Sequence, residues 1–273
     1  MKRIISTIVL FLTLTSGFSQ KNSSPYKTDF LKDGSIITGE LALNALGFYL
    51  IQNKDALTQE ELNALDKDDL WGINRPAAGN FSHRADKLSY IPFYASFATP
   101  LLFLFEKEER ENYGQIAVMF IETMATTGAL FTNTAGLVEK SRPLVYNENL
   151  PLEERTEAGA QRSFFAGHTA ATAAATFFTA KICQDFNPDS PAVPYVWAGA
   201  VAVPALVGYM RMEAGKHFLT DNIIGFGIGA ISGILIPQLH KIGNEKVEVY
   251  PAVNTNIRGT GINSQGIGIN FVL

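Results

Sequence analysis

Four long stretches of the chain carry few or no charged residues, and they restrict its fold more than any other feature. They are residues 88–105, 115–131, 193–210 and 222–239. Each is long enough for a helix, and three approach the length that crosses a bilayer. Glu122 in the second stretch and prolines in the other three also fit buried helices of a soluble bundle, which read similarly. The sequence therefore predicts a helical domain and leaves membrane insertion open.

Other segments complete the predicted architecture. Residues 169–180 are rich in alanine and threonine, which suits close helix–helix packing, and residues 36–51 form an amphipathic helix candidate. Thr58 and Glu61 form a capping box that opens a short helix. After Lys241 apolar and polar residues alternate in two runs, which indicates a β-hairpin. We expect an all-α bundle of about five to six helices, several of them possible spans, with a short C-terminal β-hairpin packed on the bundle or on a partner.

The first residues are typical of an export signal. Lys2 and Arg3 precede an apolar run at 4–14 that is too short for a good transmembrane span, and cleavage is expected near Ser19. An uncleaved anchor is the alternative. The predicted organisation is a signal peptide at 1–19, an N-terminal helical and loop region at 20–87, a main helical domain at 88–241 and the hairpin at 242–273.

Composition narrows the class of partner. The net charge is −4 and no run of lysine or arginine forms a patch, which argues against a nucleic-acid partner. Only 18% of residues are charged whereas 47% are apolar, a balance that favours membrane contact. Cys183 is the single cysteine, so no intrachain disulfide can form, and we interpret it as a packed side chain.

The first group of candidate site residues follows the second apolar stretch. Lys140 and Arg142 follow it, and Pro143 forbids further helical hydrogen bonding. Two cations at a rigid bend can clamp an anionic oxygen, with Arg142 able to bind in bidentate fashion. The alternative is a pair of ordinary charges beyond a helix C-terminus.

A second block, Gly167-His168, immediately precedes the alanine- and threonine-rich stretch. Free backbone N–H groups at that helix N-terminus can point at a phosphate, and glycine permits close approach. His168 would lie beside the anion and could give its proton to a leaving alkoxide. The alternative is a capping turn in which Ser163 or Thr169 is the cap.

The third block runs from Arg211 to Asp221. His217 and Asp221 are four residues apart, so on one helix the carboxylate could orient the imidazole and leave its other nitrogen as a nucleophile. Arg211 and His217 can converge only if the chain breaks its helix near Gly215. The alternatives are Asp221 as a helix N-cap, or a metal pair, for which no further ligand stands at a sensible spacing.

In this order the three blocks resemble the phosphatidic acid phosphatase type 2 superfamily. That family's pattern is Lys, six residues, Arg-Pro; then Pro-Ser-Gly-His; then Ser-Arg, five residues, His, three residues, Asp. The resemblance covers roughly residues 88–240. The matching residues are Arg142-Pro143, Gly167-His168, Arg211, His217 and Asp221.

The resemblance implies a helical bundle that hydrolyses phosphomonoesters or diphosphates through a phosphohistidine. It implies that His217 is the nucleophile, Asp221 its orienting partner and His168 the general acid and then base. It also implies that Arg142 and Arg211 hold the phosphoryl oxygens, with Gly167 and Lys140 as further phosphate contacts. No metal or cofactor is expected, because arginines and backbone N–H groups would stabilise the charge.

Four positions depart from the family pattern. The family lysine falls on Ala135, the Pro-Ser of the second block on Phe165 and Ala166, and the serine before Arg211 on Met210. Losing a phosphate donor can cost on the order of 3 kcal/mol of transition-state stabilisation. Because both histidines, both arginines and the aspartate are present, we expect an active enzyme, with Ser163 or Lys140 able to compensate.

The export signal and the apolar helices suggest a protein of the inner membrane or periplasm whose substrate is a phosphorylated lipid. If residues 36–51 do not span, the three blocks face the periplasm, so these residues are expected to lie at the interface or against the bundle. A soluble periplasmic acid phosphatase is the close alternative. A vanadate-dependent haloperoxidase, for which the chain is short, and a non-catalytic anion-binding envelope protein are the others. The sequence does not indicate the oligomeric state.

Overall fold

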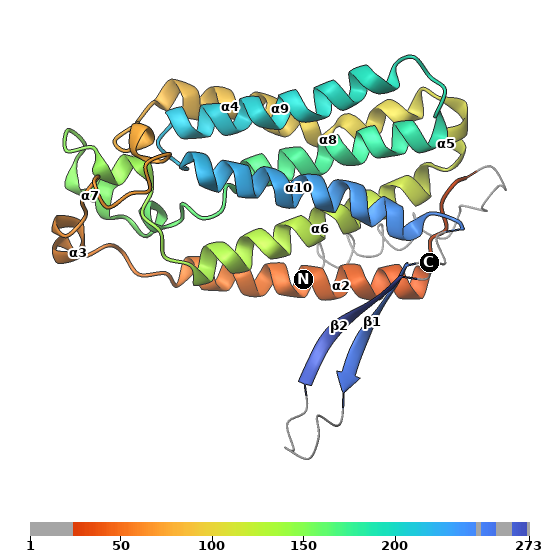
Figure 1. The fold of residues 1–273 in the computed structure, drawn as a ribbon, viewed down its shortest axis with the longest axis horizontal. Helices are drawn as coiled ribbons and strands as arrows, with labels where there is room; N and C mark the ends of the chain where they lie inside the picture. The colour runs from red at the N-terminus through yellow and green to blue at the C-terminus, as the bar shows by residue number, and fades with distance from the viewer. Residues whose placement is uncertain (1–23, 244–246, 255–263, 272–273) are drawn as a thin grey trace, which may run out of the picture.

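The computed structural model describes residues 24–243, 247–254 and 264–271, so the expected signal peptide lies outside the described residues. Six long helices run side by side along the bundle (Figure 1). They are α2 (Phe30–Gln52), α4 (His83–Phe97), α6 (Tyr113–Leu137), α8 (Gly167–Phe186), α9 (Val193–Glu213) and α10 (Leu219–His240). The predicted helical bundle is confirmed.

Short segments fill the connections between the long helices. They are the five-residue helices α3 (Gln59–Asn63), α5 (Lys107–Glu111) and α7 (Leu152–Thr156), and the 3₁₀ turns η1 (Arg75–Ala77), η2 (Thr99–Leu104), η3 (Pro143–Tyr146) and η4 (Ala158–Gln161). The described residues therefore hold nine α-helices rather than five to six, because three of them are single short turns. The predicted capping box is present at the start of α3, between Thr58 and Glu61.

Two helix boundaries differ from the sequence prediction. Helix α2 begins at Phe30 because Asp29 caps it, accepting hydrogen bonds from the N–H groups of Leu31 at 3.0 Å and Lys32 at 2.8 Å. Residues 88–105 are not one helix. Ser82 caps the start of α4, and Pro100, which has no N–H to donate, lies in the separate turn η2.

Small residues bring the helices close together. Gly225, Gly229 and Gly233 of α10 lie against the α8 segment, and a Cβ at any of them would clash with one of its carbonyl oxygens. Helices α2 and α6 also approach closely, because a Cβ at Gly47 would clash with Thr132 and a Cβ at Gly128 with the Asn44 side chain. Such four-residue spacing of small side chains is typical of helix pairs in membranes. As predicted, α8 is packed among other helices and is mostly buried.

Four helices of the described residues, α2, α6, α9 and α10, are long and apolar enough to cross a membrane. Their outer faces expose large apolar side chains, among them Leu41, Phe48, Tyr195 and Ile231. The expectation that residues 36–51 do not span is not supported, because these residues belong to α2, which runs along α6 and has the length and composition of a span. The prediction of a periplasm-facing site assumed that these residues do not span, and the composition of α2 does not support that assumption.

The C-terminal segment forms two antiparallel strands, β1 (Val247–Asn254) and β2 (Ser264–Phe271). Val247 pairs with Phe271 and Asn254 with Ser264. Figure 1 shows the pair projecting away from the helices rather than lying along them. At its base, Tyr26 and Lys241 form an isolated antiparallel bridge that ties the start of the described chain to the end of α10.

Candidate active site

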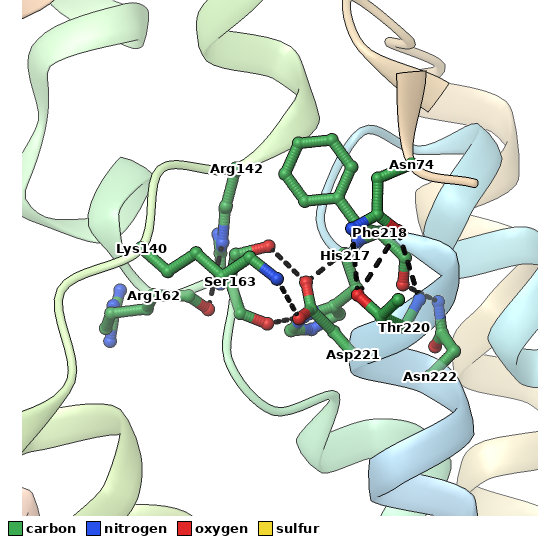
Figure 2. A network of polar contacts seen from close by, with 10 residues as sticks. All are labelled: Asn74, Lys140, Arg142, Arg162, Ser163, His217, Phe218, Thr220, Asp221 and Asn222. Carbon is green, nitrogen blue, oxygen red and sulfur yellow. Dashed lines mark hydrogen bonds and ion pairs between the residues drawn. The ribbon is translucent and has the colours of Figure 1, made fainter. Parts of the chain in front are cut away.

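All the predicted site residues lie at one end of the bundle. There α6 ends at Leu137, α8 begins at Gly167, α9 ends at Glu213 and α10 begins at Leu219 (Figure 1). The connections 138–166 and 214–218 meet at this end, and Figure 2 shows the polar network that joins them.

His217 lies in the turn between α9 and α10, with 2% of its surface exposed. Gly215 makes this turn possible: its φ is +71°, and a Cβ there would clash with the carbonyl oxygen of Asn80. His217 Nδ1 lies 2.6 Å from the carbonyl oxygen of Ser163 (Figure 2). Because a carbonyl only accepts, Nδ1 carries the proton and Nε2 keeps the lone pair that a nucleophile needs.

Asp221 is fully buried and holds three hydrogen bonds (Figure 2). Its Oδ1 accepts from Lys140 Nζ at 2.6 Å, and its Oδ2 accepts from Ser163 Oγ at 2.6 Å and from the Phe218 N–H at 3.0 Å. The expected Asp221–His217 hydrogen bond is not among the contacts of the described residues. His217 precedes α10, so the two side chains do not share a helical face. Asp221 instead fixes Ser163, whose carbonyl orients His217.

Lys140 is engaged in this support. Its ammonium group pairs with Asp221 and lies over the rings of Phe218, at 5.3 Å, and Phe164, at 5.8 Å. The sequence analysis assigned Lys140 to the phosphate, whereas in the structure its charge is directed to the buried carboxylate. Lys140 and Ser163 therefore act as one unit with Asp221.

Arg142 lies beside Arg162, a residue that the sequence analysis did not single out. Arg142 Nε donates to the Arg162 carbonyl oxygen at 3.4 Å, and Arg142 has no ion pair within the described ranges. Burial, followed by the positive charges of Arg162 and Arg211, lowers the pKa of Arg142 to about 9. The Arg162 Nε is buried and has no hydrogen-bond partner in the described structure. This side of the site therefore carries more positive charge than the nearby carboxylates of Glu157 and Asp86 offset.

Arg211, near the end of α9, is 3% exposed. Its Nη1 forms an ion pair with Asp86 of α4 and lies 3.4 Å from Ser89 Oγ, and its guanidinium lies 5.8 Å from the centre of the Tyr90 ring. Its Nε is buried without a hydrogen-bond partner in the part of the chain that the structure describes. One edge of the guanidinium is therefore held by α4, while the Nε–H remains available to an anion.

His168 is the second residue of α8 and packs against two aromatic rings of α4. Its ring centre lies 4.4 Å from that of Phe93 and 5.1 Å from that of Tyr90. Burial, followed by the positive charges of Arg211 and Arg142, lowers the pKa of His168 to about 3. Burial, followed by the same two arginines, also holds the pKa of His217 well below its usual range. Both imidazoles are neutral near pH 7 in the ligand-free protein.

Gly167 is the first residue of α8. Its N-cap, Ala166, makes no side-chain capping hydrogen bond, so no hydroxyl competes for the first N–H groups of the helix. A Cβ at Gly167 would clash with the ring of Phe131. The glycine is thus required by packing, and its predicted approach to an anion remains a prediction.

Four residues beside Arg211 and His168 were not predicted from the sequence. Asp86, Ser89, Tyr90 and Phe93 all come from α4, which begins five residues earlier than predicted. The signal was Ser82, a typical N-cap residue, which would have placed them on one amphipathic helix. Lys216 beside the site has its pKa lowered by burial and then by Arg142, so it belongs to the same cationic cluster.

The buried His217 and the partly buried His168 lie among four cations, beside a network of a carboxylate, a hydroxyl and a lysine. Such a set of groups can bind an anionic phosphoryl group. Comparison with known proteins supports this class. Residues 116–244 match the sequence model of the PAP2 superfamily. The segment that carries both histidines, both predicted arginines and Asp221 therefore belongs to this superfamily, and the resemblance drawn from the motifs is confirmed.

One solved structure is similar over most of both chains. It is described as the first transmembrane PAP2 type phosphatidylglycerolphosphate phosphatase from Bacillus subtilis. The identity is 19%, the TM-score is 0.38, and the match covers 86% of this chain and 94% of that one. No curated protein matches this chain.

Proposed function

We propose that the protein is a membrane phosphatase that hydrolyses a phosphomonoester or diphosphate through a phosphohistidine on His217. The observation that supports this most directly is the fixed tautomer of His217. Its Nδ1 is committed to the Ser163 carbonyl, and its pKa is lowered by burial and by Arg142 and Arg211. The imidazole is therefore neutral, oriented and close to the groups that would hold a phosphate.

In the proposed reaction, the His217 Nε2 attacks phosphorus, a nitrogen–phosphorus bond forms, and the ester phosphorus–oxygen bond breaks. The leaving alkoxide takes a proton from His168. Water then attacks phosphorus and gives a proton to the neutral His168. The nitrogen–phosphorus bond breaks, which releases inorganic phosphate and restores His217. Arg142 and Arg211, the two arginines whose charges act on His217, would stabilise the equatorial oxygens, and the buried Nε–H of Arg211 is free to donate.

His168 must be protonated to act as an acid, although its pKa in the ligand-free protein is lowered to about 3. A bound phosphate would place negative charge beside the imidazole and offset Arg142 and Arg211, which raises that pKa. Binding of the substrate therefore favours protonation of His168, the proposed general acid. This coupling favours anionic esters over neutral ones.

A groove beside the site favours a lipid as the alcohol part of the substrate. It lies between α9 and α10 and is almost entirely apolar, and it reaches from Met212 and Leu219 near the site turn toward the middle of the bundle. Its lining also includes Pro204, Gly208 and Phe226. Because α9 and α10 are candidate spans, an alkyl chain could lie in this groove while its phosphate meets the arginines.

The test is phosphate release by purified protein, with EDTA present, from para-nitrophenyl phosphate, phosphatidic acid, phosphatidylglycerol phosphate, isoprenyl diphosphate and lipid A. We expect release that His217→Ala abolishes and that His83→Ala, a change of an exposed histidine, leaves intact. A phosphate label acid-labile on wild type and absent from His217→Ala would support the intermediate. If the folded wild type binds vanadate but releases no phosphate, a non-catalytic anion-binding protein is favoured. Ala135, Ala166 and Met210, which lack the polar groups of the family pattern, agree with that alternative.

A further inference from the structure

A second polar cluster lies inside the bundle, near the end opposite the phosphate site. It consists of Asp33 from the first turn of α2, Glu122 from the middle of α6 and His240, the last residue of α10. Asp33 and Glu122 are each 3% exposed. One ligand atom from each of the three residues lies within 4.8 Å of the other two.

The hydrogen bonds of His240 determine which nitrogen faces the cluster. Its Nδ1 lies 2.9 Å from the carbonyl oxygen of Ile236, one turn earlier in α10, so Nδ1 carries a proton and donates it. The other nitrogen, Nε2, lies 3.4 Å from Asp33 Oδ1 and 3.4 Å from Glu122 Oε2. A histidine whose Nδ1–H is held by a backbone carbonyl, with Nε2 directed at carboxylates, has the arrangement typical of a metal ligand.

The two carboxylates are also set up as ligands. Asp33 Oδ2 accepts the Asp29 N–H at 2.7 Å, which leaves Oδ1 directed at His240. Glu122 Oε2 is buried and makes no hydrogen bond within the described residues, although it points at the same imidazole. A buried carboxylate oxygen without a donor is costly, and a cation between these groups would remove that cost.

The spacing fits a small transition-metal ion. Ligand atoms about 2.0–2.1 Å from a tetrahedral Zn²⁺ lie roughly 3.3–3.4 Å from each other. Both measured nitrogen–oxygen separations are 3.4 Å. A mixed set of one imidazole and two carboxylates suits zinc better than calcium or magnesium, which prefer oxygen ligands alone. Two carboxylates, a neutral imidazole and a divalent ion also sum to zero charge, which a bundle interior favours.

We propose that Asp33, Glu122 and His240 bind one divalent transition-metal ion of the zinc type, with a structural role. Along α10, His240 is nineteen residues from Asp221, which corresponds to about 28 Å, so the ion would take no part in phosphoryl transfer. It would join α2, α6 and α10 where Tyr26 and Lys241 already form a bridge. The proposal does not depend on the proposed phosphatase activity.

The test uses the full chain in detergent after EDTA treatment and dialysis. Calorimetric titration with Zn²⁺ should show one site per chain, and Co²⁺ should give the visible absorption of a tetrahedral nitrogen–oxygen site. Glu122→Gln and His240→Gln should weaken Zn²⁺ binding at least about 100-fold, since each removes a direct ligand. Glu108→Gln, which changes an exposed glutamate, should bind like wild type.

Folding defects are separated from ligand loss by a conservative variant. His240→Cys keeps a zinc ligand, so it should bind Zn²⁺ and regain the rise in thermal unfolding temperature that wild type shows with Zn²⁺, while His240→Gln should not. The proposal is overturned if wild type binds no stoichiometric Zn²⁺, or if Glu122→Gln and His240→Gln bind it as tightly as wild type. Either result would mean that the three side chains are held together without a metal ion.

Discussion

At the scale of single residues, the candidate site depends on a carboxylate that acts on the proposed nucleophile, His217, only through Ser163. Asp221 holds Ser163 Oγ and Lys140 Nζ, and the Ser163 carbonyl in turn holds His217. A residue with this role positions the reacting group through a neighbour. Its loss should therefore lower turnover more than it weakens binding of the anion.

Replacing Lys140 should expose this dependence. Lys140→Ala removes the only charged partner that Asp221 has among the described residues and leaves the Oδ1 of a fully buried carboxylate without a donor. We expect a loss of about 1–3 kcal/mol in the free energy of unfolding, with lower kcat. Thermal unfolding and steady-state kinetics measure both, and Lys140→Arg should restore part of each. If Lys140→Ala unfolded at the same temperature as the wild type, Lys140 would not stabilise the buried Asp221 carboxylate.

The low pKa of His168 gives a prediction about protons. The ligand-free imidazole is neutral at pH 6, because its pKa is lowered to about 3, and bound vanadate should raise that pKa. Vanadate binding near pH 6 should therefore take up a proton and weaken as pH rises. Calorimetry in buffers with different ionisation enthalpies measures this uptake, and His168→Asn should lose it. Equal uptake by His168→Asn and wild type would assign the proton to another group.

At the scale of helices, α8 and α10 approach each other through glycine. A Cβ at Gly229 would clash with the Ala170 carbonyl oxygen, whereas a Cβ at Gly227 meets nothing within 4 Å. We expect Gly229→Ala to destabilise the protein by about 1–3 kcal/mol through forced separation of the helices, and Gly227→Ala to be neutral or slightly stabilising. Thermal unfolding of the pair in one detergent checks this, and equal midpoints would contradict the packing.

The groove between α9 and α10 leads to a prediction about substrate size. Ala205 lines it, and Ala205→Trp would fill space that we assign to an alkyl chain. Activity on a phosphorylated lipid should fall about tenfold or more while activity on para-nitrophenyl phosphate stays close to wild type. Ile231→Trp, on an exposed part of α10 outside the groove, is the matched control. Equal loss on both substrates would place the alkyl chain elsewhere.

At the scale of the whole molecule, the six long helices alternate in direction, so the candidate active site and the base of the hairpin lie at opposite ends of the bundle (Figure 1). If the bundle spans a membrane, Asp66 and Asp189 lie on opposite faces. With Cys183→Ser as background, single cysteines at these exposed positions should react with a membrane-impermeant maleimide from opposite sides. Labelling of both from one side would show that the bundle does not span.

The sequence by itself determines the helices, the break between α9 and α10, and the family motifs. Charge-free stretches of helical length predict the helices, since each must bury or shield its apolar surface, and Gly215 predicts the break that separates α9 from α10. The spacing of Arg142, His168 and His217 predicts the family and the placement of these residues between helices, because such motifs depend on local order along the chain.

Only the tertiary structure decided which groups meet. Asp221 pairs with Lys140, 81 residues away, and Arg211 pairs with Asp86, 125 residues away. Such contacts depend on which helices pack against each other. The spacing of residues along the chain does not determine that packing. The same holds for Asp33, Glu122 and His240, which come from three helices and converge only because the bundle brings α2, α6 and α10 together.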